Sequence, residues 1–249
     1  MTNKKFKRLF FDIETSPNIV FSWNVGRKIS IDYDNIVQER AIICICWKWE
    51  GEKQVYSLEW KNGDDKEMLK KFSRVLEEAD EITGHNGDQF DLKWLRTRCL
   101  YHGIPMFPDY QTIDTLKLSR KGFRFNSNRL DYISKFLGIG RKNETGFGLW
   151  KAIVSNNDKS AMKKMVDYCK KDVVLLEKVY EKLNPYVAHQ VHRAVMIGKS
   201  ICDCPECTSK RTISNGTRIT ASGSIKRRLH CMTCGKYFSI SDAAYQKNR

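Results

Sequence analysis

The stretch Leu9-Phe10-Phe11-Asp12-Ile13-Glu14-Thr15 is a short apolar segment that ends in two acids one residue apart. Its apolar side chains would fall on both faces of an extended chain, which is typical of a strand buried inside a sheet. Residues two apart in a strand project to the same face, so Asp12 and Glu14 would point the same way. Two carboxylates so close repel each other, and Mg²⁺ or Mn²⁺ between them would relieve that repulsion. The alternative is an exposed strand end, where acids need no partner.

The composition is that of a folded, basic protein. Of the 249 residues, 41% are apolar and 11% aromatic, which suffices for one large domain or for a core domain with a small appendage. The net charge of +15 favours a polyanionic partner, with nucleic acid as the first candidate. The last 51 residues hold 10 Lys/Arg and 3 Asp/Glu, so the C-terminal part is the more basic one per residue.

The sequence disfavours both a membrane partner and a disulfide framework. The longest uncharged apolar run, Ala41 to Trp47, is far shorter than the about 18 residues of a membrane span. No apolar signal core follows the basic N-terminus, so we expect a cytoplasmic protein. An odd number of cysteines, nine, argues against disulfides there. Cys44, Cys46 and Cys99 are expected to be small core residues.

The order of patterns along the chain predicts a mixed α/β sheet. The first three strands are expected at residues 8–15, 41–49 and 53–58, with a long connection at residues 16–40 between the first two. Helical spacing then alternates with short strands, beginning at residues 64–79, where Asp64 or Asp65 is the expected N-cap. The most regular helix spans residues 160–183. Antiparallel strands followed by β-α alternation indicate a sheet with helices packed on it. Residues 141–150 are expected to be a mobile, glycine-rich loop.

Two stretches mix aromatic and basic side chains. Residues 16–40 include Phe21, Trp23 and Tyr33, and residues 117–129 alternate cations with aromatics. Aromatic rings stack on bases and cations bind phosphates, so the first stretch would either clamp a nucleotide or pack on the core. The sequence leaves these two alternatives open.

Two further acids lie at positions where functional sites of α/β proteins are usually found. Asp91 opens a helix that follows a strand, and Asp172 lies in an apolar part of the 160–183 helix. Sites in such sheets lie at the C-terminal strand ends, and a sheet-facing Asp172 would be costly without a partner. Tyr168 is four residues before Asp172 and shares its helix face. A surface-facing Asp172 is the alternative.

Three motifs together resemble those of the DEDD (DnaQ-like) 3′→5′ exonucleases. The first is Phe11-Asp12-Ile13-Glu14-Thr15, and the second is His85-Asn86-Gly87-Asp88-Gln89-Phe90-Asp91. The third is Tyr168-Cys169-Lys170-Lys171-Asp172, which resembles the tyrosine branch because Asp167 stands where the histidine branch has His. The likeness is greatest to the proofreading exonuclease domain of family-B DNA polymerases and covers about residues 6–185.

The resemblance implies a fold, a chemistry and a substrate. The fold would be a ribonuclease-H-like mixed five-stranded sheet, order 3-2-1-4-5, flanked by helices. Two Mg²⁺ or Mn²⁺ ions about 4 Å apart would act on the scissile phosphate. The implied substrate is nucleic acid, with single-stranded DNA preferred and RNA as the nearest rival. An endonuclease of the same fold is a further alternative.

The resemblance also implies a role for each site residue. Asp12 would bridge both ions, Glu14 and Asp172 would complete the ion that generates the nucleophile, and Asp91 would hold the second ion. Tyr168 would orient the attacking water, because a normal tyrosine pKa near 10 makes a poor base at neutral pH. Asn86, Phe90 and Thr15 are the implied substrate contacts. Asp114 is interpreted as a structural acid at a strand–helix corner.

A cysteine pattern marks the C-terminal part. Cys204-Pro205-Glu206-Cys207 and Cys231-Met232-Thr233-Cys234 are separated by 23 residues, a spacing that suits one tetrahedral structural Zn²⁺. The second motif continues as Gly235-Lys236-Tyr237-Phe238, which resembles a zinc ribbon. Cys202 and His230 are alternative ligands. We therefore expect a ribonuclease-H-like domain at residues 1–190 and a zinc-ribbon domain at 199–249.

The expected zinc ribbon is basic, with Lys226-Arg227-Arg228 at its centre. A salt-dependent grip on nucleic acid phosphates is one interpretation, and docking of a protein partner is the other. A zinc-ribbon binding protein with a secondary nuclease role is thus the alternative to a dedicated exonuclease. The presence of Asp12, Glu14, Asp91, Tyr168 and Asp172 together favours the exonuclease.

Overall fold

A computed structural model describes residues 5–26, 28–141 and 146–248. Its main sheet has the strand order β5-β4-β1-β6-β7. The strands are β1 (Arg8–Thr15), β4 (Ile42–Trp49), β5 (Tyr56–Glu59), β6 (Glu81–Gly84) and β7 (Thr112–Asp114). Counted along the chain this order is 3-2-1-4-5, so the predicted ribonuclease-H-like topology is confirmed.

Strand direction places several chain ends at one edge of the sheet. β4 runs antiparallel to β1 and β5, whereas β6 is parallel to β1 and β7 is parallel to β6. The carboxyl ends of β1, β6 and β7 therefore meet at the same edge. The connections that follow β6 and β7 lead there into helices, so this edge collects the residues that end strands and begin helices.

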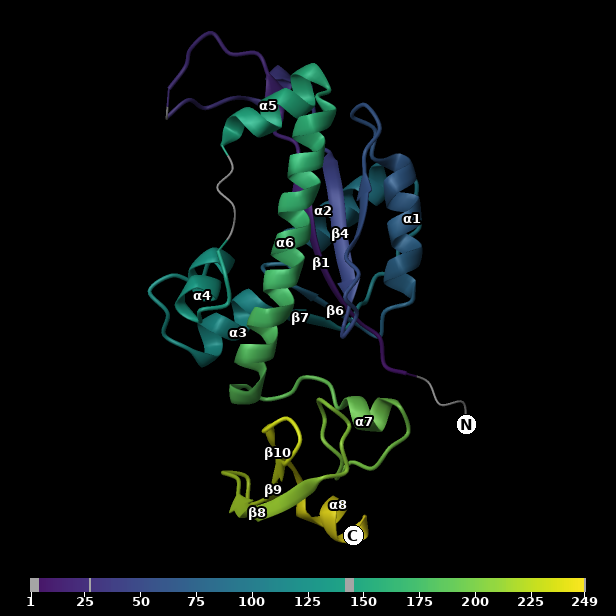
Figure 1. The fold of residues 1–249 in the computed structure, drawn as a ribbon, viewed down its shortest axis with the longest axis vertical. Helices are drawn as coiled ribbons and strands as arrows, with labels where there is room; N and C mark the ends of the chain where they lie inside the picture. Colours follow the sequence, from purple (N-terminus) through teal and green to yellow (C-terminus); the bar gives the residue numbers. More distant parts are fainter. Residues whose placement is uncertain (1–4, 27, 142–145, 249) are drawn as a thin grey trace.

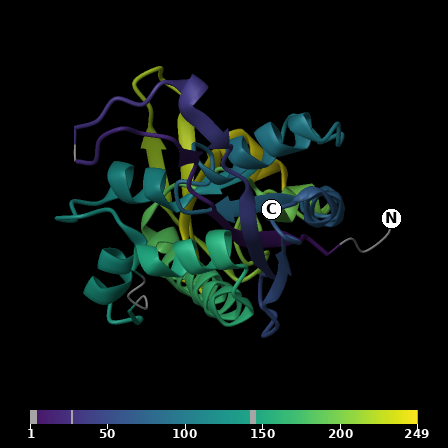
Figure 2. The same ribbon diagram turned by 90° about the horizontal axis from the view of Figure 1, so that it is seen from above.

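Helices cover both faces of the sheet (Figures 1 and 2). Seen from above in Figure 2, the sheet lies between α6 on one side and α1 and α2 on the other. The helices are α1 (Lys66–Glu77), α2 (Asp91–Tyr101), α3 (Thr115–Gly122), α4 (Leu130–Phe136), α5 (Phe147–Asn156) and α6 (Lys159–Leu183). In the residues that the structure describes, no helix is long and apolar enough to cross a membrane.

The alternation of β1 sorts its side chains between the two helix layers. On the α6 side, the Arg8 guanidinium lies 4.5 Å from the Tyr180 ring centre, and the Phe10 ring lies 5.8 Å from it. On the opposite side, the Phe11 ring lies 5.7 Å from that of Phe72 in α1. Both faces of β1 are thus buried, and its even-numbered residues, the two acids included, belong to the α6 layer.

Helix α6 presents one long face to the sheet. Its buried residues recur every three or four positions, as a helix face requires: Met165, Cys169, Asp172, Leu176 and Tyr180. Asp158 caps the start of the helix by accepting hydrogen bonds from the backbone N–H groups of Ser160 and Ala161. The face places one acid, Asp172, among apolar neighbours against β1.

Two local predictions need correction, and a third, the N-cap of α1, is refined. The third strand spans Tyr56–Glu59 rather than residues 53–58, because residues 50–55 form the turn and its exit. Asp65 occupies the N-cap position of α1, as predicted, but its buried carboxylate accepts hydrogen bonds from Arg98. The side chain of Asp64, the other predicted cap, accepts a hydrogen bond of 2.9 Å from the N–H of Lys66 at the start of the helix. Part of the predicted mobile loop at 141–150, residues 142–145, lies outside the described residues, and α5 begins at Phe147.

The C-terminal part forms a small separate sheet, in the order β10-β9-β8. Its strands are β8 (Thr212–Ile219), β9 (Ile225–Cys231) and β10 (Tyr237–Ser241), followed by α8 (Asp242–Lys247); the short helix α7 (Arg193–Met196) precedes this part of the chain. The buried apolar residues are Leu229, Phe238 and Ile240, too few to form a large core. We call residues 200–248 the cysteine module. The predicted small module beside the main sheet is confirmed.

The cysteine module sits below the end of the main sheet at which β1 begins (Figure 1). Lys236 is buried there, and its Nζ donates to the carbonyl oxygen of Val187 at 2.7 Å and to Oδ1 of Asn184 at 2.7 Å. Asn184 begins the short helix η2 (Asn184–Tyr186) that follows α6. The module is therefore anchored on the end of α6, remote along β1 from Asp12 and Glu14.

Candidate active site and cysteine centre

Three of the predicted acids converge at the sheet edge. Asp12 and Glu14 come from the end of β1 and Asp172 from the facing side of α6, and one carboxylate oxygen of each lies within 4.8 Å of those of the other two. Asp172 is only 1% exposed, so the alternative of a surface-facing acid is wrong. The group forms because alternate side chains of β1 and one face of α6 point toward each other, which brings Asp12 and Glu14 close to Asp172.

Asp91 lies next to this group but not in it. It is 3% exposed, and its Oδ1 accepts a hydrogen bond of 3.1 Å from the backbone N–H of Ile13, between the two acids of β1. Burial and the nearby negative charge of Asp12 raise the pKa of Asp91 well above its ordinary value. Asp91 thereby ties the start of α2 to the end of β1.

The donor set of the three-acid group fits a hard divalent cation. Its carboxylate oxygens are the ligands that Mg²⁺ and Mn²⁺ prefer. Asp64, Asp65 and His102 also bring ligand atoms within 4.8 Å and are compatible with a metal site. There, however, Arg98 donates to both oxygens of Asp65 at 2.8 Å, so its guanidinium already supplies the positive charge. The group at the end of β1 is the better candidate.

The other predicted site residues lie around the three acids. Tyr168 is half-buried on α6, one turn before Asp172. Asn86 and Phe90 lie in the turn that leads from β6 to Asp91; Asn86 has φ +66°, and its N–H donates to Asp114 at 2.8 Å. Asp114 also caps α3, in agreement with its structural interpretation. The catalytic and substrate-binding roles of these residues remain predictions.

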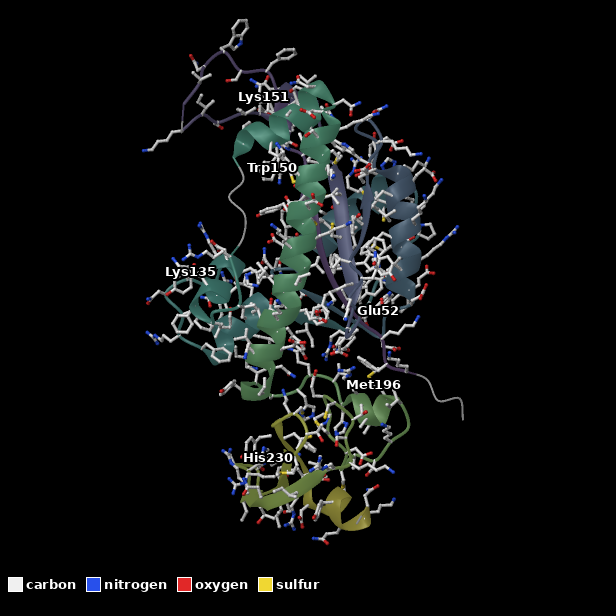
Figure 3. All side chains as sticks on the ribbon, in the orientation of Figure 1. Glu52, Lys135, Trp150, Lys151, Met196 and His230 are labelled. Carbon is white, nitrogen blue, oxygen red and sulfur yellow. The ribbon has the colours of Figure 1, made fainter. Side chains whose placement is uncertain are left out.

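A cavity of about 310 Å³ opens at the carboxyl end of β1. It is lined by Thr15, Ser16, Pro17, Arg40, Phe147 and Trp150. Thr15 is a predicted substrate contact, and its carbonyl oxygen accepts a hydrogen bond of 3.1 Å from Nε1 of Trp150. Trp150 lies on α5 (Figure 3). Sequence reasoning missed Trp150 and Phe147. Their spacing of three, continued by the buried Ile153, is the signal that would have indicated a helix face.

A layer of thiols lies under Asp12. The Sγ atoms of Cys44, Cys46 and Cys169 lie within 4.8 Å of one another, and all three residues are fully buried. Cys169 Sγ is 3.4 Å from the carbonyl oxygen of Asp12 and 3.6 Å from its Oδ2. Thiols favour soft metal ions and carboxylates favour hard ones. The predicted core position of Cys44, Cys46 and Cys99 is confirmed.

The excursion between β1 and β4 projects from the molecule past α5 (Figure 1). It is held by β2 (Ile19–Val20), β3 (Ile36–Gln38) and the single turn η1 (Tyr33–Asn35). The side chains of Phe21, Trp23 and Tyr33 are 76% or more exposed, so these aromatics do not pack on the core.

The four predicted zinc ligands lie together in the cysteine module. The Sγ atoms of Cys204, Cys207, Cys231 and Cys234 are all within 4.8 Å of one another, with two pairs at 3.5 Å. Four thiol donors in this arrangement suit a tetrahedral Zn²⁺. Cys202 and His230 are not in the group: Cys202 packs beside the small apolar core, and His230 stacks on Tyr237 at 4.1 Å. The cysteine cluster therefore indicates a zinc site made by these four residues.

Comparison with known proteins places this architecture in a family. A sequence profile described as RNase_H superfamily matches residues 9–184. The chain belongs to the RNase_H superfamily. A DNA polymerase of Thermococcus hydrothermalis is 30% identical to it over 134 residues, which cover 49% of this chain and 7% of the polymerase. The RNase_H domain thus spans a small fraction of that curated relative's length.

A solved structure gives the same picture at the level of fold. The family B DNA polymerase from the hyperthermophilic archaeon Pyrobaculum calidifontis is similar with a TM-score of 0.57 and 18% identity. The match covers 73% of this chain and 25% of that chain. This RNase H-like domain therefore resembles one region of a family-B DNA polymerase, and its three-acid group lies within the matched residues 9–184.

Proposed function

We propose that the protein is a metal-dependent 3′→5′ exonuclease of the tyrosine branch, acting on single-stranded DNA. The observation that carries the proposal is the convergence of Asp12, Glu14 and Asp172 within 4.8 Å at the carboxyl end of β1. The similarity of the RNase_H domain to part of a DNA polymerase supports nucleic acid as the substrate.

The residues have distinct tasks in this proposal. Asp12, Glu14 and Asp172 would hold the divalent ions, whose chemistry is to generate a nucleophilic hydroxide and to stabilise charge on the phosphate and the leaving oxygen. Asp91 holds the end of β1, the strand that carries Asp12 and Glu14, by accepting a hydrogen bond from the N–H of Ile13. Tyr168, on the same helix face as Asp172, would hold the attacking water by a hydrogen bond and so orient it.

The cavity beside Thr15 is the proposed seat of the terminal nucleotide. Its volume of about 310 Å³ and its aromatic wall of Trp150 and Phe147 fit a nucleobase, and Arg40 offers a positive charge to a phosphate. Thr15, which lines the cavity, directly follows Glu14 in β1, so a nucleotide seated there would bring its phosphodiester toward the acids. Asn86 and Phe90, in the turn before Asp91, are proposed contacts to the same end of the strand.

An end-labelling assay tests the reaction. With Mn²⁺, a 5′-labelled single-stranded DNA should yield a ladder that shortens by one nucleotide at a time, whereas a 3′-labelled strand should release mononucleotide at once. Early internal fragments would indicate the endonuclease alternative. Asp12→Ala should abolish hydrolysis and keep the zinc content, and metal-dependent hydrolysis that persists in this variant contradicts the assignment.

RNA is the second candidate substrate, because carboxylates that bind metal ions do not read a 2′-hydroxyl. The same labelled-end assay on an RNA of identical sequence separates the two. For the cysteine module we propose one structural Zn²⁺, supported by the four clustered thiols. A protein partner on this module is the alternative to a role in nucleic acid binding.

A further inference from the structure

Aromatic side chains gather on one surface beside the lower half of α6. They come from the α3–α4 connection, from α4 and from η2: Phe123, Phe125, Tyr132, Phe136 and Tyr186. The rings of Phe123 and Phe125 are stacked at 5.4 Å, and Phe136 meets Phe125 edge-on at 5.4 Å. Phe136 is 65% exposed and Tyr186 is 80% exposed, so the cluster offers ring faces to solvent.

The segment that supplies most of these aromatics is strongly positive. Residues 117–141 contain seven Lys/Arg and one acid, Asp131. Five of the cations are exposed and form no ion pair with another residue that the structure describes: Arg120, Lys121, Arg124, Arg129 and Lys135. Figure 3 shows Lys135 on the outer side of α4. We call the five aromatics and these five cations the aromatic–basic strip.

The strip is connected at one end to the edge of the sheet that carries the acids. The ring of His85, the residue after β6, lies 2.9 Å from Oγ1 of Thr115 at the start of α3 and 3.0 Å from the carbonyl oxygen of Asn128. This contact fixes the α3–α4 connection against the strand next to β1. The strip is therefore held at this end by the connection after β6, which also carries Asn86 and leads to Asp91.

At its other end the strip reaches the cysteine module. The ring of Tyr186 lies 6.1 Å from that of Phe123, and Tyr186 stands between Asn184 and Val187, which both bind Lys236 of the module. Figure 1 shows α3 and α4 beside α6, between α5 above and the cysteine module below. The strip thus lies between the candidate active site and the second basic part of the chain.

We propose that the aromatic–basic strip is a track for the 5′ part of a single-stranded nucleic acid whose 3′ end occupies the acidic site. Exposed rings bind unpaired bases by stacking, while the alternating cations bind phosphates without reading sequence. A duplex keeps its bases stacked inside and offers no ring face to Phe136 or Tyr186. The inference rests on the proposed exonuclease function for the direction of the strand, but not for the binding itself.

The geometry gives the track a length. Asp172 and Leu183, just before η2, are 11 residues apart on α6, a separation of about 17 Å at 1.5 Å per residue. At about 3.4 Å per nucleotide of a stacked strand, this corresponds to about five nucleotides. A trinucleotide at the acids would therefore not reach Tyr186, whereas a 12-mer would cover the strip.

Binding of labelled oligothymidylates tests the track. The full chain carrying Asp12→Asn is titrated with a 5′-fluorescent trimer and 12-mer. Combining Phe136→Ala with Tyr186→Ala should weaken 12-mer binding by about ten- to a hundredfold and leave trimer binding within twofold. Combining Tyr101→Ala with Phe107→Ala, two exposed aromatics outside the strip, is the matched control and should leave both unchanged. An affinity for the 12-mer within twofold of the parent in the strip variant overturns the proposal.

The salt dependence of binding and the affinity for a duplex provide two further tests. Combining Arg124→Ala with Lys135→Ala should lower the slope of log K against log salt by about 0.7 for each phosphate that the variant no longer neutralises. Equal loss of affinity for a 12-base-pair duplex in the aromatic variant would overturn the single-strand assignment. Hydrolysis of the 12-mer by the chain with native Asp12 is measured in parallel. Its absence would refute the exonuclease proposal while leaving the binding result for the strip to stand or fall separately.

Discussion

The guanidinium of Arg8 and the carboxylate of Glu206 lie 2.6 Å apart, although 198 residues separate them in the chain. Arg8 is the first residue of β1, and Glu206 lies inside the first Cys-x-x-Cys motif. Glu81, Glu50 and Tyr180 also surround the buried guanidinium. Burial disfavours the charged form of Arg8, but Tyr180 and these three carboxylates outweigh it and raise the pKa of Arg8. The strand that carries the candidate catalytic acids is thus clamped to the cysteine module.

Glu206→Gln should loosen this clamp. The amide keeps the size of the side chain but removes a charge from a site where Arg8 and Arg193 converge. Because Arg8 retains Glu81 and Glu50, we expect a loss of about 1–3 kcal/mol in the free energy of unfolding, measured by urea titration. Glu52→Gln, on the exposed turn next to Glu50, is the control and should change little. Equal losses in the two variants would contradict the role of the clamp.

The purified chain should contain one zinc per molecule by elemental analysis. Cys231→Ser removes a buried member of the four-thiol group and should abolish the zinc and lower the thermal midpoint, because a module with so few apolar residues depends on its metal. Cys202→Ser is the matched control, since Cys202 lies outside the group, and it should retain the zinc. Loss of zinc in Cys202→Ser would show that the ligand set is different.

Tyr168→Phe should lower kcat by about a hundredfold and leave KM within twofold, since a hydrogen bond that orients the attacking water acts mainly in the transition state. Steady-state hydrolysis of a labelled single strand measures both constants. Tyr101→Phe, which removes an exposed phenol on α2, should have parental kinetics. A rise in KM with unchanged kcat would instead make Tyr168 a substrate contact.

Asp65 should make stability fall at acidic pH. Its burial alone would raise the pKa, but hydrogen bonds from Arg98, from the N–H of Ile42 and from His102 lower it below the ordinary value. Because the pKa of Asp65 is lower in the folded chain than in the unfolded chain, ionised Asp65 stabilises the fold at pH values above its unfolded-state pKa of about 3.9. This stabilisation is lost as the pH falls through the folded-state pKa. Asp65→Asn leaves Arg98 without its carboxylate and should cost about 3–5 kcal/mol at pH 7.

Urea titrations across pH 3–7 measure this effect. The stability of Asp65→Asn should depend less on pH below about pH 4 than that of the parent, because the titrating group is gone. Asp109→Asn, an exposed acid, is the control and should keep the parental profile. Parallel profiles for Asp65→Asn and the parent would show that Asp65 is not the group responsible.

The sequence predicted those parts of the fold that follow from local periodicity. Alternation in β1 placed Asp12 and Glu14 on one face. The helix pattern left Asp172 either buried or surface-facing, and the resemblance of the three motifs was what implied that it joins the two acids of β1. The order of strands and helices indicated an α/β sheet, and the resemblance to the DEDD exonucleases implied its strand order. The cysteine group followed from ligand spacing, which zinc chemistry restricts closely.

What the sequence did not reveal depends on contacts between distant residues. Nothing near Arg8 or Glu206 in the chain indicates that they pair, because the partner of a buried charge is fixed only when the elements dock. Lys236, which we assigned to a ribbon motif, is a buried anchor with three backbone and side-chain acceptors. Trp150 was missed because the glycines around α5 outweighed its helical spacing.

The positions of its side chains on one face mean that β1 cannot gain or lose a single residue. Arg8, Phe10, Asp12 and Glu14 are an unbroken series of alternate residues on the α6 side. One residue inserted between Arg8 and Asp12 would rotate one end of the series onto the α1 layer, so either the guanidinium or the carboxylates would face hydrocarbon. Insertions or deletions within this segment are tolerated only in pairs, a constraint that reading-frame-preserving mutagenesis of eight codons would reveal directly.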